Sequence, residues 1–172
     1  MSLLEDFTQI NPLLLDLKVF DLIDNQWMLI TAGNTDKMNT MTASWGTLGI
    51  LWNKPIAIIF IRPQRYTYEF IEANDLFSLS FFDESYRDAL EFCGTKSGRD
   101  YNKPEETGLT TTPTPNGAIA FNEAELILEC KKLYFGDIKE MNFLDPTIVS
   151  RNYPHKDFHR FYIGEIIGSY KR

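Results

Sequence analysis

The sequence predicts a mainly β fold with short helical insertions, arranged as a barrel-like antiparallel sheet. Segments of strand length, either alternating between apolar and polar residues or continuously apolar, recur along the chain between turn residues. Helical patterns are few and short, and they do not alternate regularly with the strands. Together these observations give about seven strands and two or three short helices.

The composition is that of one domain with a substantial core. The chain has 172 residues, of which 44% are apolar and 14% aromatic, so we expect residues 1–172 to form a single domain. The formal charge of -7 argues against a nucleic-acid or membrane surface, because both partners require a basic face. Any anion must therefore be captured locally.

Targeting signals and disulfides are not expected. No run approaches the roughly 18 apolar residues of a membrane helix, and residues 1–11 lack the pattern of a signal peptide. A cytoplasmic location is therefore the simplest interpretation. Cys93 and Cys130 lie in unlike contexts far apart, which favours reduced thiols.

The N-terminal part predicts three strands. Residues 1–12 are expected to be a partly ordered lead-in, because Asn11-Pro12 interrupts any helix. Residues 18–23 alternate as a half-buried strand. Residues 27–32 and residues 38–44 follow as two strands joined by a tight turn.

The middle of the chain predicts a buried strand and two helices. Residues 56–61 are an unbroken apolar run, which predicts a central strand buried on both faces. Thr67 is placed to cap a short helix, and residues 76–82 alternate as another strand. A second helix over residues 86–92 is expected to end at Cys93-Gly94 in a left-handed glycine cap.

In the last third, we expect a helical turn over residues 104–107 and an extended connection over residues 110–117. Two strands follow over residues 118–121 and 125–134. Residues 136–150 are expected to be irregular, with a break at Asp145-Pro146, and residues 158–167 to form a long final strand.

The stretch from Asn39 to Gly49 is interpreted as a binding loop. Its small residues allow backbone N–H groups to approach an anion, and Thr40, Thr42 and Ser44 add hydroxyl donors. Trp45 offers a flat apolar surface to a ring system. The alternative is a polar turn whose tryptophan is buried in the core.

Four cations of this acidic chain fall in two short loops: Arg62, Arg65, Lys96 and Arg99. They lie next to the helix start at Thr67 and the turn at Ser97-Gly98. Unpaired helix N–H groups, the helix dipole and guanidinium forks all favour an anion, so a phosphate site is one interpretation. The other is that these cations pair with surface carboxylates.

Two histidines offer further chemistry. His159 lies in the predicted final strand on the same face as Phe161, and it is either a site residue or a hydrogen-bonded structural one. His155 and Asp157 do not support a metal site, because the chain has only these two histidines and no helical ligand motif.

Several familiar catalytic motifs are missing from the sequence. The glycine patterns of Rossmann and P-loop proteins and the nucleophile elbow of hydrolases do not occur. Lys96 would lower the thiol pKa of Cys93, but the preceding helix C-terminus would raise it. Cys93 is therefore expected to be structural or adjacent to a ligand.

Three motifs and the end of the chain resemble the flavoredoxin branch of the flavin reductase-like proteins. They are N-T-M-T-A-S-W-G-T-L-G-I-L-W-N-K-P, R-P-Q-R-Y-T-Y-E-F-I-E and C-G-T-K-S-G-R-D, followed by H-R-F-Y-I-G-E-I. Their occurrence in order, across residues 15–170, is more specific than any one motif. The resemblance implies an FMN-binding split β-barrel that works as a homodimer, with the flavin near the subunit interface.

The resemblance also implies roles for individual residues. The flavin ring edge and part of the phosphate chain would be held by Asn39, Thr40, Met41, Thr42, Ala43, Ser44 and Trp45. The phosphate side would contact Arg62, Arg65, Tyr66 and Thr67. A second ring-edge segment would contain Cys93, Lys96, Ser97 and Gly98, and His159 would approach the cofactor or substrate.

The resulting hypothesis is an oxidoreductase that passes reducing equivalents from NAD(P)H through FMN to a flavin or redox-protein acceptor, with His159 and Lys96 as catalytic residues. Lys96 beside the ring would raise the flavin potential. One alternative is an FMN-holding electron carrier reduced by a basic partner protein. Another is a barrel that binds a different phosphorylated ligand without redox chemistry.

Overall fold

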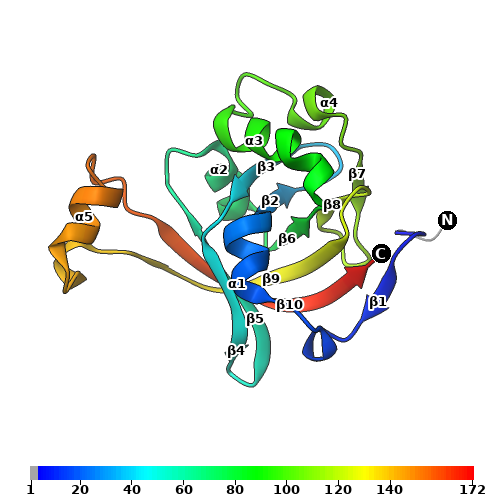
Figure 1. Ribbon diagram of the computed structural model, residues 1–172, viewed down its shortest axis with the longest axis horizontal. Coiled ribbons are helices and arrows are strands. Elements are labelled where there is room, and N and C mark those ends of the chain that lie inside the picture. The colour runs from blue at the N-terminus through cyan, green and yellow to red at the C-terminus, as the bar shows by residue number, and fades with distance from the viewer. Residues whose placement is uncertain (1–3) are drawn as a thin grey trace.

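The computed structural model describes residues 4–172 (Figure 1). Most of the chain forms an antiparallel sheet in the order β3-β2-β6-β9-β10-β5-β4, with β1 paired to β10. Its strands are β1 (Thr8–Ile10), β2 (Met28–Gly33), β3 (Met38–Ala43), β4 (Gly46–Leu51), β5 (Lys54–Ile61), β6 (Leu76–Phe81), β9 (Leu126–Asp137) and β10 (Arg160–Lys171). A separate pair contains β7 (Thr111–Pro113) and β8 (Ile119–Phe121).

The sheet is a barrel that does not close. Among residues 4–172, β3 pairs only with β2 and β4 only with β5, so these two strands are the edges of the sheet. They are nevertheless consecutive in the chain, joined by Ser44 and Trp45. The sheet therefore curves until its two edges meet at this corner without hydrogen bonding. The predicted mainly β fold is confirmed.

The helices are short and lie in the connections. They are α1 (Val19–Asp21), α2 (Tyr66–Ala73), α3 (Arg87–Thr95), α4 (Lys103–Thr107) and α5 (Pro146–Asn152), with a π-helical turn η2 (Leu22–Gln26) and the 3-10 turns η1 (Pro12–Leu14), η3 (Glu84–Tyr86) and η4 (Glu140–Asn142). Over residues 4–172, none is long and apolar enough to cross a membrane.

Two apolar clusters stabilise this arrangement. The barrel interior contains Ile30, Ile59, Phe77 and Tyr162, all fully buried. The second cluster lies beneath α3 and the small sheet, around Phe82, Leu90 and Phe121. β2 contributes to both clusters, because Leu29 and Ile30 are successive strand residues that point to opposite faces.

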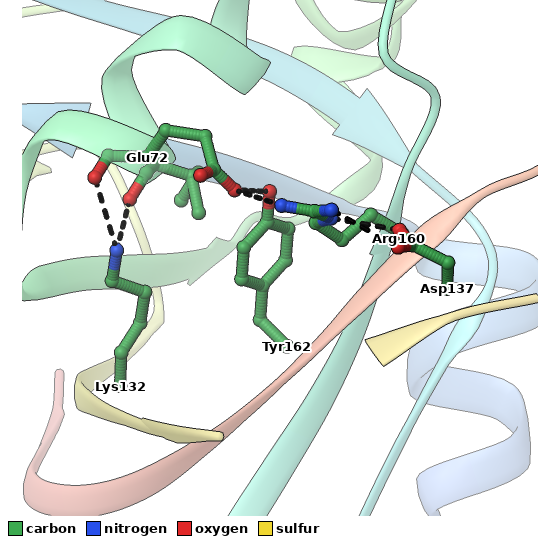
Figure 2. A network of polar contacts seen from close by, with 6 residues as sticks. Glu72, Lys132, Asp137, Arg160 and Tyr162 are labelled. Atoms are coloured by element: carbon green, nitrogen blue, oxygen red, sulfur yellow. Dashed lines mark hydrogen bonds and ion pairs between the residues drawn. The ribbon is translucent and has the colours of Figure 1, made fainter. Parts of the chain in front are cut away.

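A polar network fixes α2 to the sheet (Figure 2). Lys132 donates to the backbone oxygens of Ile71 at 2.5 Å and Glu72 at 3.4 Å, which satisfies the C-terminal end of the helix. Tyr162 donates to the Glu72 carboxylate at 2.5 Å, and Arg160 reaches the same carboxylate at 3.3 Å. These contacts fasten the C-terminal end of α2 to β9 and β10.

The ends of β9 and β10 extend beyond the body of the molecule and carry η4 and α5 (orange at the left of Figure 1). We call residues 138–159 the arm. The sequence predicted an irregular segment over 136–150 with a break at Asp145-Pro146. That prediction is wrong, because Pro146 is the first residue of α5 and Asp145 caps the helix by accepting from Thr147 N at 2.9 Å.

Three other sequence predictions are also wrong. Of the segment 18–23, residues 19–23 are helical rather than extended, because Val19, Leu22 and Ile23 follow helical spacing and the last two are buried. Gly94 does not cap α3, which continues to Thr95. The glycines of the segment 46–49 belong to β4 and not to a loop.

The predicted strands from the second onward are otherwise confirmed, with shifted ends. Residues 56–61 form most of β5, which lies between β10 and β4 and is one strand from the edge. The predicted burial on both faces is wrong, because Ile58 and Phe60 are only partly buried. The final strand starts at Arg160, so His159 immediately precedes it.

Candidate functional site

Two adjoining cavities lie where the edges of the sheet meet, and both are lined by Arg65. The aromatic cavity, of about 210 Å³, is lined by Met41, Thr42, Ala43, Ser44, Trp45, Phe60, Arg62, Arg65 and His159. The cationic cavity, of about 150 Å³, is lined by residues that include Asn39, Arg65, Tyr66, Thr67, Lys96, Ser97, Gly98 and Lys103. The three segments singled out from the sequence therefore surround one region of the structure.

The aromatic cavity presents rings and one buried imidazole. The ring centroids of Trp45 and His159 are 5.5 Å apart, and Trp45 is 48% exposed. Tyr153, from the arm, shares a 2.7 Å hydrogen bond with His159 Nδ1. Burial, with a smaller effect of the Arg62 charge, lowers the pKa of His159 to about 4. At neutral pH the imidazole is therefore uncharged.

Arg62 is committed to the arm. Its guanidinium donates to Asp157 Oδ2 at 2.5 Å and to the backbone oxygen of Asn152 at 2.8 Å. Gln64 donates to the same Asp157 oxygen at 2.7 Å. The positive charge of Arg62 is thus compensated within the chain, and the contact fastens the arm beside His159.

Arg65 is the opposite case. It is the N-cap residue of α2, and its side chain forms no ion pair or hydrogen bond with any residue from 4 to 172. Burial, and then the nearby Arg62 charge, lowers the pKa of Arg65, but a guanidinium stays protonated at neutral pH. Within the described part of the chain, no Asp or Glu lines the cationic cavity. The site therefore carries uncompensated positive charge.

The predicted cap of α2 is wrong, since the helix begins at Tyr66 and Thr67 is inside it. Thr67 is buried, and its hydroxyl accepts a 2.8 Å hydrogen bond from Asn39 Nδ2. This bond ties β3 to α2. Asn39 Oδ1 faces Gly98, where an added Cβ would lie 1.9 Å from that oxygen, so the bend at residues 96–98 requires glycine.

The threonine hydroxyls of β3 form hydrogen bonds within the protein. Thr40 Oγ1 lies 2.8 Å from Thr31 Oγ1 and donates to the backbone oxygen of Ile30 at 3.2 Å. Thr42 Oγ1 donates to the backbone oxygen of Leu90. Of the three hydroxyls expected to bind an anion, only that of Ser44 has no protein partner among residues 4–172.

The structure places Lys96, His159 and Cys93 differently from what the sequence predicted. Lys96 is exposed and lines the cationic cavity, whereas His159 lines the aromatic one, so these two residues do not share a cavity. Cys93 is fully buried, and burial raises the pKa of its thiol to about 11. Sequence reasoning missed Lys103 and Tyr153, because no local pattern indicates that either side chain is buried.

Comparisons with known proteins identify the family and the fold. A sequence model described as "Flavin reductase like domain" matches residues 20–168. The chain belongs to the flavin reductase-like family. No sequence of curated function matches it.

Solved structures share the fold at low sequence identity. The FMN-binding protein of Thermus thermophilus with bound p-hydroxybenzaldehyde is 19% identical over 85% of this chain and 71% of its own, with a TM-score of 0.66. Flavoredoxin from Methanosarcina acetivorans is 23% identical over 86% of this chain and 68% of its own, with a TM-score of 0.66. The NADH:FAD oxidoreductase of Streptomyces globisporus in complex with NAD and FAD fragments is 16% identical over 86% and 74%, with a TM-score of 0.63. These structures confirm the split-barrel fold.

Proposed function

We propose that this family member is an oxidoreductase that binds FMN across the two cavities and passes reducing equivalents from NAD(P)H to a second acceptor. The observation that carries the proposal is Arg65, a half-buried guanidinium without a carboxylate partner among residues 4–172, placed where the two cavities adjoin. A ligand with an anionic end and an aromatic end matches this arrangement.

The cationic cavity suits the phosphate of FMN. Arg65 and Lys96 supply charge, and the first turn of α2 supplies N–H groups that have no partner within the helix. Guanidinium–phosphate hydrogen bonds are among the stronger ones in proteins. Asn39, Thr67 and Gly98 shape this cavity by holding β3, α2 and the bend together.

The aromatic cavity suits a flat ring. Trp45 and Phe60 provide apolar surface, and both contact His159. FMN, when bound, supplies the hydride- and electron-accepting chemistry. The uncharged His159, held by Tyr153 through Nδ1, presents its other ring nitrogen for a hydrogen bond to cofactor or substrate.

The electron donor and acceptor are inferred from proteins of similar structure. The Streptomyces relative binds NAD and FAD fragments, which supports NAD(P)H as the donor. The formal charge of -7 favours a second role, that of an electron carrier for a basic redox protein, and the flavoredoxin relative has the same fold. Both thiols are free, in keeping with a cytoplasmic protein.

We also propose a homodimer. The β4–β5 hairpin exposes Ile50 and Trp52, and Trp52 contacts Tyr134 at a centroid distance of 6.3 Å. Exposed apolar side chains on this hairpin and on the neighbouring β9 are of a kind that marks protein interfaces. Sedimentation equilibrium tests this, and a monomer at micromolar concentration contradicts it.

Anaerobic mixing with NADH or NADPH tests the function. The purified protein, loaded with FMN, is expected to lose its visible flavin absorbance with either nucleotide. Absorbance that falls only after a reduced partner protein is added supports the carrier role. A protein whose fluorescence titration shows no affinity for FMN contradicts both roles.

A further inference from the structure

Lys103 is a buried cation for which the site described so far has no role. It is the first residue of α4, and its side chain is 3% exposed. The ammonium donates to the backbone oxygens of Thr40 at 2.7 Å and Cys93 at 2.8 Å. Lys103 thus connects β3, α3 and α4, and it lines the cationic cavity.

The two acceptors leave Lys103 only partly satisfied. An ammonium has three N–H donors, and two of them are used by the carbonyls. Carbonyl oxygens are dipoles and do not neutralise a charge, and no carboxylate among residues 4–172 pairs with Lys103. Buried lysines are rare unless paired, because an uncompensated charge is costly to bury.

Other basic residues beside Lys103 add positive charge that a bound anion would compensate. Arg65 and Lys96 line the same cavity, and Lys37 and Arg99 line the adjoining outer cavity with Lys103. Arg99 is paired with Glu69, so its charge is compensated.

We propose that Lys103 binds the phosphate of FMN through its third N–H, and that FMN binding at high pH is coupled to uptake of a proton by this amine. The inference rests on the proposed function and extends it by adding a ligand and a proton linkage to the site. It is independent of how the ring lies in the aromatic cavity.

The direction of the linkage follows from burial. Burial lowers the pKa of Lys103 to about 8, with the Cys93 charge raising it and the Arg65 charge lowering it. A bound phosphate, doubly charged above pH 7, favours the ammonium form and raises that pKa. Above pH 8 the free protein therefore holds a neutral amine that must gain a proton when FMN binds.

Other titratable groups face this region from each neighbouring element. They are Arg65 and Tyr66 on α2, Cys93 on α3, Lys96, Arg99, Asp100 and Tyr101 in the connection to α4, and Lys37 before β3. The other titratable residues of α4 itself are Glu105 and Glu106. Variants of Lys103 are needed to separate its titration from theirs.

The test compares FMN with riboflavin, which has the same ring and no phosphate, by fluorescence titration from pH 7 to 9.5. For the wild type, we expect FMN affinity to fall by up to about tenfold per pH unit above pH 8, while riboflavin affinity stays level. Lys103→Arg keeps a permanent charge, so its FMN affinity is expected to be independent of pH.

Lys103→Met removes the charge and is expected to weaken FMN binding by about tenfold at pH 7, with riboflavin binding unchanged. Circular dichroism checks that both variants fold. If the wild type shows no pH dependence, or Lys103→Met weakens FMN and riboflavin equally, the inference is overturned. A wild type that binds neither flavin overturns the proposed function as well, which distinguishes the two failures.

Discussion

The two cavities of the site differ in how the chain compensates charge. Arg62 and Arg65 lie three residues apart, yet Arg62 is paired with Asp157 while Arg65 has no acidic partner among residues 4–172. In the aromatic cavity His159 is uncharged, and the cationic cavity is lined by three basic residues and by no Asp or Glu of the described chain. The first is suited to a neutral ring and the second to an anion.

The difference arises from the elements that surround each arginine. Arg62 follows β5 and meets the arm, which supplies Asp157 and the backbone oxygen of Asn152. Arg65 sits at the start of α2, opposite β3 and the bend at residues 96–98, which supply no acid. Proximity in sequence therefore says little about the role of a cation.

The largest effect is expected for Arg62→Met, which should lower the free energy of unfolding. The substitution removes three hydrogen bonds of a charged group and leaves the partly buried Asp157 without its cation. We expect the free energy of unfolding to fall by about 3 kcal/mol, measured by urea denaturation. The preference for FMN over riboflavin should remain, and its loss would show that Arg62 also binds phosphate.

Arg65→Met, in contrast to Arg62→Met, should weaken FMN binding and leave the stability of the fold nearly unchanged. Without a charged partner in the described chain, Arg65 contributes little to folding, so the free energy of unfolding should change by less than about 0.5 kcal/mol. FMN affinity is expected to fall up to about a hundredfold while riboflavin affinity stays constant. Arg172→Met, far along the chain and paired with Asp6, serves as the control. Equal losses for both flavins would contradict the phosphate assignment.

His159 should make stability depend on pH. Its pKa is about 4 in the folded protein and about 6.5 in the unfolded chain, so the unfolded chain binds the proton first as pH falls. The free energy of unfolding should therefore decrease by about 2 kcal/mol between pH 6.5 and 4. His159→Gln should flatten this part of the profile, whereas His155→Gln, at an exposed position, should leave it intact. A profile unchanged by His159→Gln would contradict the buried, neutral imidazole.

Lys96 should have the smallest effect. It is exposed and lines the cationic cavity, so Lys96→Met is expected to weaken FMN binding by about threefold, and less at high salt. The flavin midpoint potential should stay unchanged, because Lys96 does not line the aromatic cavity. A lowered potential in Lys96→Met would instead support the ring-edge role that the resemblance implied.

Much of the fold could be predicted from local patterns. The apolar run of β5 and the apolar–polar alternation of β6 identify strands because successive side chains point to opposite faces of a sheet, although in β6 the serines are buried as well. The region 18–23 was misread, since a short segment can satisfy both alternation and helical spacing. The sequence could not show that the sheet edges meet at Ser44 and Trp45, because long-range pairing determines that corner.

The site was predictable at the level of segments and not of individual contacts. Motifs located the residues near Asn39, Arg62 and Lys96, which the structure brings together. Which side chains face the ligand depends on partners far away in the chain. Thr40 is turned to Thr31, Arg62 to Asp157, and Lys103 to two backbone oxygens that no sequence pattern reveals.

The most direct test of the division between the two cavities is a crystal structure of the FMN complex, read at the position of the phosphorus atom. We expect the phosphate to lie within hydrogen-bond distance of the Arg65 guanidinium in the cationic cavity, with the ring against Trp45. A phosphate bound beside Trp45 and His159, with the ring elsewhere, would contradict the account.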